Sequence, residues 1–399
     1  MSERLPAVVL APGRDHPARA RHPWVFSGAV ARVEGSPEDG AEVDLLAADG
    51  TFIARGLFNS KSQIRVRLYS WDAAERIDEA LFARRIDGAL ALRASLDLMT
   101  PHGGCRLVFS EGDGLSGLVV DRYRDILSMQ LTSLALGLRR ELLLDLLEER
   151  LRPAGVLLRT EKGVLEEEGL EARDGLLRGT APDEPIPVVE NGLTFLVDLR
   201  TGQKTGYFLD QRDNRVAVAR YAQGRRIADV FCYTGGFTLP CLRAGAASVV
   251  GVDMSATAVG LAAANAGANG LDDGRVRFET SDAFKWLDGR AAAGERFDLI
   301  VLDPPRFARS SRGVPSAVKG YRRLNEIAVR CLEPGGILVT CSCTGRVTRE
   351  MFEGVLAEVE VATGRRIRIL ENRGQAGDHP VSPTCPETAY LKCLVCGVE

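Results

Sequence analysis

The chain has 399 residues, of which 45% are hydrophobic and 26% are charged, and its formal net charge is −3. This length favours two or three domains, and the composition excludes a disordered chain. A net charge near zero gives no global signal for nucleic acid, so any such binding has to depend on local sites. No apolar run reaches the roughly 18 residues of a membrane helix, and the first residues lack the apolar core of a signal peptide. We therefore expect a cytoplasmic protein without membrane contact, whose 9 cysteines are reduced thiols.

The first block of the sequence, residues 1–72, is rich in short β-type runs separated by Gly, Pro and Asp turns. These runs lie at 7–12, 41–50, 51–58 and 62–70. The pattern predicts a small β domain. The second block, residues 73–187, mixes alternating runs with helical stretches at 78–98 and 138–151, which predicts an α+β domain. It ends in the Pro- and acid-rich stretch TAPDEPIPVV, which is typical of a domain boundary.

The third block, residues 188–399, alternates strand-like and helix-like segments. Strands are predicted at 225–233, 248–254, 275–282, 297–305, 335–343, 365–372 and 389–396. Helices are predicted between them at 235–245, 255–270, 316–332 and 348–364. Strand and helix alternation of this kind predicts an α/β fold with a mainly parallel, doubly wound sheet.

Glycines and acidic residues follow the first three predicted strands of this block. Gly235 and Gly236, in DVFCYTGGF (229–237), let the backbone turn tightly where a ligand approaches a helix N-terminus. Asp253 ends the second strand, where a carboxylate can accept hydrogen bonds from both ribose hydroxyls, and Asp282 follows the third strand, where it can meet an adenine edge. The motif is not GxGxxG, which disfavours a dinucleotide-dependent dehydrogenase.

These strand ends resemble those of the class I S-adenosylmethionine-dependent methyltransferases, from Asn191 to the C-terminus. The resemblance implies S-adenosylmethionine as the cofactor. It also implies a seven-stranded sheet, with the apolar segment 389–396 in an added edge hairpin. The cofactor site is then expected to include Asp229, Phe231, Tyr233, Gly235, Asp253, Met254, Asp282 and Ala283.

Asp303, Pro304 and Pro305 end the fourth predicted strand, FDLIVLDPP. Two consecutive prolines cannot continue a central strand, so they turn the chain away from the sheet beside the pocket. In methyltransferases the related (D/N)PP(Y/F) motif faces a planar amine or base. Asp303 is therefore expected to hydrogen-bond the N3/N4 edge of a cytosine and to stabilise the charge that develops there.

The segment after the two prolines, residues 306–323, is basic and contains no acidic residue. Its cations are Arg306, Arg309, Arg312, Lys319, Arg322 and Arg323. Beside an active-site mouth such a segment can hold phosphates. A solvated face on an Arg-rich chain is the alternative interpretation.

Two cysteines, Cys341 and Cys343, lie at the end of the fifth predicted strand. Cys341 ends an apolar run and is expected to pack, whereas Cys343 lies just before the turn at Gly345. A thiolate there could add to carbon 6 of a cytosine and so make carbon 5 nucleophilic. The alternative is that both are core thiols. A disulfide between them would be strained, and the pair Cys393 and Cys396 lacks the further ligands that zinc needs.

Five motifs together resemble the bacterial large-subunit (23S) ribosomal RNA cytosine-C5 methyltransferases. They are TGQKTGYFLDQRDNR (201–215), DVFCYTGGF (229–237), LDPPRFARS (302–310), SCTG (342–345) and GDHPVSPTCPETAYLKC (377–393). The segments HPWVFSGAV and EGDGLSGLVVDRY resemble the PUA domain and the middle domain of that family. The resemblance implies a PUA-like RNA-binding domain at 1–72, a middle domain at 73–187 and a methyltransferase domain at 188–399.

The resemblance also implies roles for individual residues. Cys343 corresponds to the nucleophilic thiol of the family's SCS/SCT motif, and Asp303 is the second catalytic residue. Gln211 is expected at the cofactor, and the substrate is expected to contact Pro304, Pro305, Arg306, Phe307 and Arg212. Many RNA cytosine-C5 methyltransferases have a second cysteine directly after the two prolines. Because this chain has Arg306 there, the motif does not identify the base that removes the carbon-5 proton.

The implied partner is 23S ribosomal RNA, and a homodimer is compatible with the sequence. A PUA domain implies recognition of RNA shape and backbone, and the target cytosine would have to be flipped out, to stack on Phe307, or on Tyr207 and Phe208. Two alternatives stay open. One is a methyltransferase of the same fold that modifies guanine N7 or an exocyclic amine, which needs no thiol. The other is a non-catalytic RNA-binding assembly factor.

Overall fold

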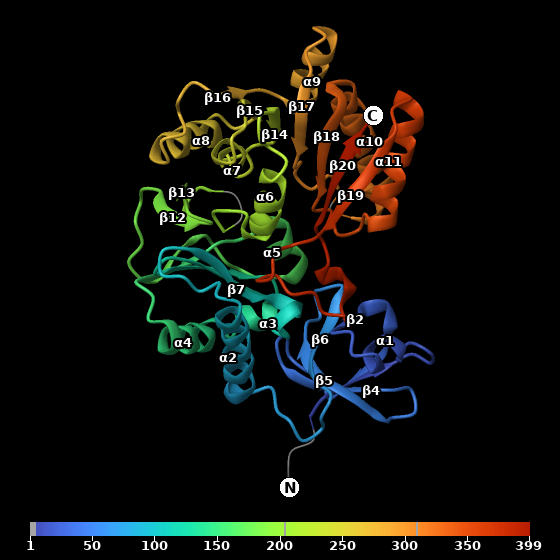
Figure 1. Ribbon diagram of the computed structural model, residues 1–399. Helices are drawn as coiled ribbons and strands as arrows, with labels where there is room; N and C mark the ends of the chain where they lie inside the picture. The colour runs from blue at the N-terminus through green and yellow to red at the C-terminus, as the bar shows by residue number, and fades with distance from the viewer. Residues whose placement is uncertain (1–4, 203–204, 309) are drawn as a thin grey trace. The chain divides into compact units, whose positions relative to one another are not determined.

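The computed structural model describes residues 5–202, 205–308 and 310–399, and the chain forms two compact units. Unit 1 consists of residues 1–188, 197–209 and 377–388, and unit 2 consists of residues 189–196, 210–376 and 389–399. The N-terminal half of the chain is blue to green in Figure 1, and the C-terminal half is yellow to red. Each unit therefore includes segments that are distant in sequence.

The first sheet of unit 1 is built from the N-terminal block. Its strands are β1 (Ala7–Leu10), β2 (Trp24–Phe26), β3 (Val30–Glu34), β4 (Glu42–Leu46), β5 (Phe52–Phe58) and β6 (Ile64–Ser70). They follow the order β2-β6-β5-β4-β1-β3, and all neighbours are antiparallel except β1 and β4. The short helix α1 (His16–Arg19) contributes Ala18 to the core of this sheet. The four strands predicted in this block are confirmed.

The second sheet of unit 1 has five strands and is packed by helices. The strands are β7 (Gly104–Phe109), β8 (Leu118–Tyr123), β9 (Ile126–Leu131), β10 (Gly155–Leu158) and β11 (Gly175–Gly179), in the order β11-β10-β9-β8-β7. The helices are α2 (Glu79–Ser95), α3 (Leu134–Gly137), α4 (Arg140–Leu151) and α5 (Lys162–Glu168). Leucines of α2 and α4 share one core with the strands, as their helical spacing predicts. A separate pair of strands, β12 (Ile186–Glu190) and β13 (Leu193–Val197), follows in the chain.

Unit 2 contains a seven-stranded sheet in the order β16-β15-β14-β17-β18-β20-β19. Its strands are β14 (Arg226–Val230), β15 (Ser248–Asp253), β16 (Val276–Thr280), β17 (Phe297–Leu302), β18 (Leu332–Ser342), β19 (Ile367–Arg373) and β20 (Lys392–Val398). The first five run parallel to one another, whereas β20 is antiparallel to both β18 and β19. The predicted seven-stranded, mainly parallel sheet is confirmed. The terminal strand, predicted at 389–396, is β20, which lies between β18 and β19, so β19 is the edge strand.

Helices cover both faces of this sheet. They are α6 (Arg212–Ala219), α7 (Thr238–Arg243), α8 (Ala256–Ala268), α9 (Ala283–Ala292), α10 (Val314–Arg330) and α11 (Arg349–Thr363). In Figure 1, α9, α10 and α11 lie on one face, and α6, α7 and α8 on the other. The central strands β14 and β17 are almost entirely buried, because helices cover them on both faces.

Two helices of unit 2, α6 and α9, escape prediction from the sequence. The buried residues of α6 include Arg212, Asn214 and Arg215, so the helix lacks the usual apolar stripe. The start of α9 is fixed by its N-cap, where the Asp282 carboxylate accepts a hydrogen bond from Lys285 N at 2.9 Å.

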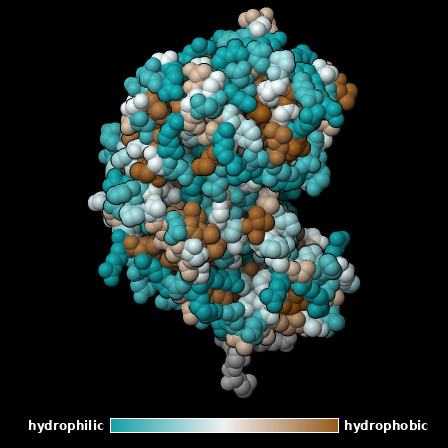
Figure 2. Space-filling view, in the orientation of Figure 1, coloured by the Kyte–Doolittle hydropathy of each residue, from teal (hydrophilic) through white to brown (hydrophobic). Residues whose placement is uncertain are grey.

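The described helices include none with the length and apolarity to cross a bilayer. On the face drawn in Figure 2, hydrophilic residues dominate, and hydrophobic residues lie in small scattered groups.

Candidate active site

The predicted site residues of unit 2 follow strands that run parallel to one another. Phe231 follows β14, Asp253 ends β15, Asp282 comes two residues after β16, Asp303 follows β17 and Cys343 follows β18. The carboxyl ends of parallel strands meet at one edge of a sheet, which is where ligands bind in open α/β folds. The fold therefore collects these residues at a single edge.

The loop after β14 is held in an unusual backbone conformation. Phe231 and Tyr233 have φ angles of 68° and 49°, and Gly235 has a φ of 84°. Phe231 N donates to Val252 O at 2.8 Å, and Tyr233 N donates to the Asp253 carboxylate at 3.0 Å. Left-handed backbone at non-glycine residues costs free energy, and it is concentrated at ligand-binding loops.

Gly235 is fixed by both its conformation and its surroundings. A Cβ at this position would lie 2.7 Å from Leu239 Cδ1, and the positive φ would add strain. The turn before α7 therefore requires glycine at this position.

Asp229, the fourth residue of β14, is 1% exposed. Thr238 Oγ1 donates to its Oδ2 at 2.6 Å, whereas its Oδ1 has no hydrogen-bond partner within the described chain. Burial raises the pKa of Asp229 to about 6. A buried carboxylate oxygen without a donor is costly, and the ammonium group of S-adenosylmethionine would supply one. The residues present therefore fit that cofactor.

Asp253 and its neighbours suit the adenosine end of the cofactor. The carboxylate accepts from Tyr233 N and from Ser255 N, at 3.0 and 2.9 Å, which fixes its orientation. Each carboxylate oxygen keeps a further acceptor site for a ribose hydroxyl. The next residue, Met254, is 76% exposed, so its thioether can cover a bound base without disturbing the core. Asp282 is exposed but caps α9 with one oxygen, and Ala283 is buried beneath it.

Asp303 lies at the exit of β17 and has a raised pKa. Burial raises the pKa of Asp303 to about 7, and the Asp210 charge adds to that rise. Gln211 Nε2 donates to Asp303 Oδ1 at 3.0 Å, and Gln211 Oε1 in turn accepts from Asn214 Nδ2 at 2.6 Å. The TGQKTGYFLDQRDNR motif thus supplies a side-chain pair that orients the predicted catalytic carboxyl group. This contact places Gln211 at Asp303.

Cys343 is the partly exposed thiol of the chain, whereas the other eight cysteines are buried. Its Sγ lies 3.9 Å from Pro304 O, so the thiol faces the first of the two prolines. The next residue, Thr344, is held by its hydroxyl, which contacts Tyr321 OH at 2.8 Å and Phe307 N at 3.3 Å. Two strand ends and α10 therefore fix the position of this thiol.

Cys341 is fully buried and lies opposite Cys393 in the β18–β20 pairing. A hydrogen bond with the Cys393 thiol and burial raise the pKa of Cys341 well above its usual range. The prediction that Cys341 packs is confirmed. A neutral thiol inside the sheet is a poor base.

The residues predicted to contact substrate differ in exposure. Pro304 is buried, Pro305 and Arg306 are exposed, and the Phe307 ring stacks on Tyr321 with centroids 4.6 Å apart. Arg212 is buried, 3.9 Å from Glu190. Only a nucleotide that enters the protein could reach Arg212. In unit 1, Tyr207 is also buried, so its ring is not presented as a stacking surface.

The basic segment after the prolines is partly neutralised. Arg322 pairs with Glu326 and Glu358, and Arg323 pairs with Asp288. Arg309 lies outside the described residues. The segment therefore presents fewer uncompensated cations than its composition indicates.

Two buried cations of the site were not predicted. Arg215 of α6 donates a hydrogen bond to Glu190 at 2.8 Å. It also packs against Gly236, because a Cβ added to that glycine would lie only 2.8 Å from Arg215 Nε. Lys392, the first residue of β20, is 3% exposed, and its Nζ donates to Thr344 O and Tyr390 O, both at 2.8 Å. Arg215 lies in a motif that was recognised, and Lys392 was visible as a lone cation in the apolar run AYLKCLVC.

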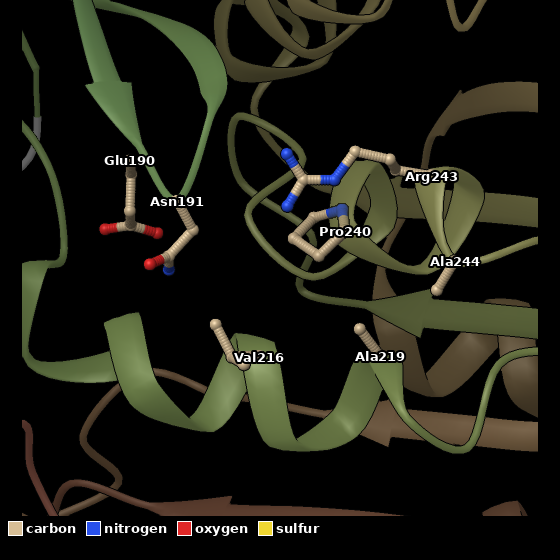
Figure 3. Close-up of a pocket in the computed structure, with 7 residues that line it drawn as sticks. All are labelled: Glu190, Asn191, Val216, Ala219, Pro240, Arg243 and Ala244. Carbon is tan, nitrogen blue, oxygen red and sulfur yellow. The ribbon is translucent and has the colours of Figure 1, made fainter.

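A cavity of about 130 Å³ lies between the β12–β13 turn, α6 and α7 (Figure 3). Its lining consists of Glu190, Asn191, Val216, Ala219, Pro240, Arg243 and Ala244. None of these is a predicted site residue, and the cavity is smaller than the roughly 300 Å³ of an ordinary ligand pocket. It is distinct from the strand-end site.

Among the described residues, His22, Cys385 and Glu387 of unit 1 could hold a metal by proximity, with ligand atoms within 4.8 Å of one another. However, His22 Nδ1 accepts a hydrogen bond from Trp24 N at 3.2 Å, so the ring proton is on Nε2, which faces Glu387 at 3.2 Å. A metal at Nε2 would need that nitrogen unprotonated. The three residues therefore fit a hydrogen-bonded group.

The strand order, the reversed β20 and the acidic residues at the strand ends define a class I methyltransferase. Comparison with known proteins agrees with this class. Residues 173–391 match the S-adenosylmethionine-dependent methyltransferase family model, and residues 8–71 match a PUA-like domain. The crystal structure of SMU.776, a methyltransferase complexed with SAH, superposes with a TM-score of 0.86 at 19% identity, over 98% of this chain and 99% of that one.

Sequence relatives are similar over their whole length. The ribosomal RNA large subunit methyltransferase I of Aeromonas salmonicida is 42% identical over 97% of this chain and 98% of that protein. The protein of the same name from Erwinia tasmaniensis is 41% identical over 98% of this chain and 99% of that protein. The chain belongs to this family of S-adenosylmethionine-dependent methyltransferases with a PUA-like domain, and S-adenosylmethionine is its cofactor.

Proposed function

We propose that the chain methylates carbon 5 of a cytosine in large-subunit (23S) ribosomal RNA through a covalent Cys343 adduct. The printed names of the relatives support large-subunit ribosomal RNA as the substrate. The observation that carries the cytosine-C5 assignment is the partly exposed Cys343 thiol, 3.9 Å from the carbonyl of the Pro304 that follows Asp303. Methylation of a ring nitrogen or an exocyclic amine needs no thiol, because the target atom has its own lone pair.

The reaction begins with Cys343, because carbon 5 of cytosine is a poor nucleophile. The thiolate forms a bond to carbon 6, and the electrons of the C5–C6 double bond move toward the N3 edge. S-adenosylmethionine supplies an electrophilic methyl group. Carbon 5 takes this methyl group as the bond between the methyl carbon and the cofactor sulfur breaks. Carbon 5 then loses its proton, and the C5–C6 double bond re-forms as the C6–S bond breaks and Cys343 leaves as a thiolate. Arg306 stands where related enzymes have a second thiol, so no cysteine of that motif is present to take the carbon-5 proton.

Asp303 acts at the opposite edge of the base. With a pKa of about 7, a large fraction of Asp303 is protonated at neutral pH. The protonated carboxyl group can donate to N3 as the thiolate adds, and it takes the same proton back when the adduct collapses. Gln211 holds Asp303 in place for this transfer.

We also propose that the chain has three domains with different roles. Residues 1–72 form the PUA-like RNA-binding domain, residues 73–187 a middle domain, and residues 188–399 the methyltransferase domain. The other assigned contacts also remain proposals: Asp229, Phe231, Tyr233, Gly235, Asp253, Met254, Asp282, Ala283 and Gln211 hold the cofactor, and Pro304, Pro305, Arg306, Phe307 and Arg212 contact the RNA. The substrate and the reduced thiols both suit the bacterial cytoplasm.

The experiment that tests this function is mass mapping of modified nucleotides in ribosomal RNA from a deletion strain. One 5-methylcytosine should disappear from 23S RNA, and wild-type protein should restore it, whereas Cys343→Ala should not. If the 5-methylcytosine inventory is unchanged by the deletion, the proposal is wrong. If Cys343→Ala restores a lost modification fully, the chain methylates an atom that needs no nucleophile.

A further inference from the structure

Lys392 is a buried cation without a carboxylate partner, a costly arrangement that calls for compensation. It is 3% exposed, and no ion pair joins it to an acidic residue in the described part of the chain. Its Nζ donates to two backbone carbonyls, Thr344 O and Tyr390 O, which leaves one of its three N–H groups for another acceptor. Carbonyl dipoles only partly offset the loss of hydration of a full charge.

The position of Lys392 follows from the sheet register. Lys392 lies directly opposite Ser342, the last residue of β18, and Cys343 is the next residue in the chain. The bond from Lys392 Nζ to Thr344 O therefore holds the residue that directly follows Cys343. The reversal of β20 brings a lysine near the C-terminus of the chain to the end of the strand before the thiol.

We propose that Lys392 is a positioning residue that stabilises the thiolate form of Cys343 and fixes Thr344, the residue that follows it. A thiolate beside Lys392 supplies the missing negative charge, and the lysine charge favours the reactive form of the nucleophile. The inference deepens the proposed function, because it concerns the same thiol.

The charges around the two groups agree with this pairing. Burial lowers the pKa of Lys392 to about 8, and the Cys343 charge is the contribution that opposes this shift. At neutral pH most Lys392 side chains are therefore still charged.

Other groups face the pair from the surrounding elements. The positive charge of Arg349 on α11 lowers the pKa of Lys392. The negative charges of Cys343 and Asp303 both raise the pKa of Tyr321 on α10. Tyr390, whose carbonyl accepts from Lys392, donates its hydroxyl to Asp210. Asp303 at the exit of β17 is the nearby carboxyl group, and at a pKa of about 7 it carries only part of a negative charge at neutral pH.

Alkylation of the free enzyme tests the proposal without substrate or cofactor. Because Cys343 is partly exposed and the other eight cysteines are buried, iodoacetamide should modify Cys343 in the folded protein, with the site identified by peptide mass spectrometry. The rate is measured from pH 5 to 10 for the wild type, Lys392→Met and Lys392→Arg. Cys343→Ser gives the background, and Lys285→Met removes an exposed lysine of α9 as the matched control.

We expect Lys392→Met to slow alkylation about tenfold at pH 7 and to move the pH midpoint upward, because an adjacent cation favours the thiolate. Lys392→Arg should retain most of the wild-type rate, and Lys285→Met should match the wild type. An unchanged profile for Lys392→Met overturns the proposal. Equal slowing in Lys392→Met and Lys392→Arg, together with equally lowered melting temperatures, also overturns it, because a purely structural role would then suffice.

The outcome is separable from that of the proposed function. A change in the alkylation profile of Cys343 does not depend on which nucleotide is methylated. Conversely, loss of 5-methylcytosine in the deletion strain does not depend on Lys392.

Discussion

The cofactor half and the catalytic half that we propose for the strand-end site are built in different ways. After β14 and β15, backbone geometry positions the binding groups. Phe231 and Tyr233 adopt positive φ, and main-chain N–H groups orient Asp253. At β17 and β18, side chains from distant segments orient the reacting groups. Gln211 holds Asp303, and Lys392 holds Thr344, the residue after Cys343.

The difference follows from what each half has to do. A cofactor is bound by fixed hydrogen-bond donors and acceptors, which a rigid backbone turn provides. A nucleophile and an acid need adjusted proton affinities, which require burial and nearby charges. Mutations in the two halves should therefore have separable effects on cofactor binding and on turnover.

The largest effect is expected from Cys343→Ala. Turnover of a covalent mechanism should fall by at least about a thousandfold, because the nucleophile is lost. Single-turnover methylation of a 23S RNA fragment with radiolabelled S-adenosylmethionine measures this loss. Binding of S-adenosylhomocysteine, measured by calorimetry, should stay at the wild-type value. A parallel loss of cofactor binding would contradict the separation of the two halves.

The reverse pattern is expected from Asp253→Ala. Loss of two hydrogen bonds from ribose hydroxyls to a carboxylate should weaken cofactor binding about 10- to 100-fold. Turnover at saturating S-adenosylmethionine should change little. Calorimetry and the concentration dependence of methylation measure the two quantities. A fall in turnover with unchanged affinity would place Asp253 in the catalytic half.

The support of Asp303 by Gln211 can be tested within one helical turn. Gln211→Ala should lower turnover about tenfold, since one hydrogen bond that orients the carboxyl group is lost. Asp213→Ala, whose exposed side chain lies two residues away, is the matched control and should keep wild-type activity. Equal effects of both changes would mean that the loss reflects the stability of α6.

The raised pKa of Asp303 predicts that the stability of the protein depends on pH. Its folded pKa of about 7 is above the usual value of 3.8, so the folded protein binds a proton that the unfolded chain releases. The resulting stabilisation is complete below about pH 4 and is lost as pH rises through about 7, with a total of a few kcal/mol at most, on the order of 1.4 kcal/mol per pKa unit. The Tm of the wild type should therefore fall from pH 5 to 8 by more than that of Asp303→Asn. A wild type and a variant with parallel Tm curves would contradict the raised pKa.

The comparison of the two halves also explains which site residues could be predicted from the sequence. The strand ends, Asp229, Asp253 and Cys343 could be predicted, because apolar runs with polar ends have a direct structural meaning. Cys341 could be separated from Cys343 because it ends the apolar run.

Arg215, Lys392 and the support of Asp303 by Gln211 could not be predicted in the same way. Their partners are far away in sequence: Arg215 meets Glu190, Lys392 meets Thr344, and Gln211 meets Asp303. Helix α6 was missed for the same reason, because its buried face is partly polar. Buried charge networks depend on the tertiary structure, so a periodic pattern of apolar residues does not reveal them.

The smallest effects are expected in the basic segment after the prolines. There the effect of removing an arginine depends on whether its charge is already paired with a carboxylate. Arg323 already pairs with Asp288 at an exposed site, and loss of such a pair costs about 0.5 kcal/mol or less. Arg306 is exposed and has no ion pair to another described residue, so it can meet a phosphate. Arg306→Ala should lower the slope of log K for RNA binding against log salt by up to about one, and Arg323→Ala should change it less. Equal slopes for the two variants and the wild type would mean that RNA phosphates do not contact this segment, and that the cations at 306–323 are solvated.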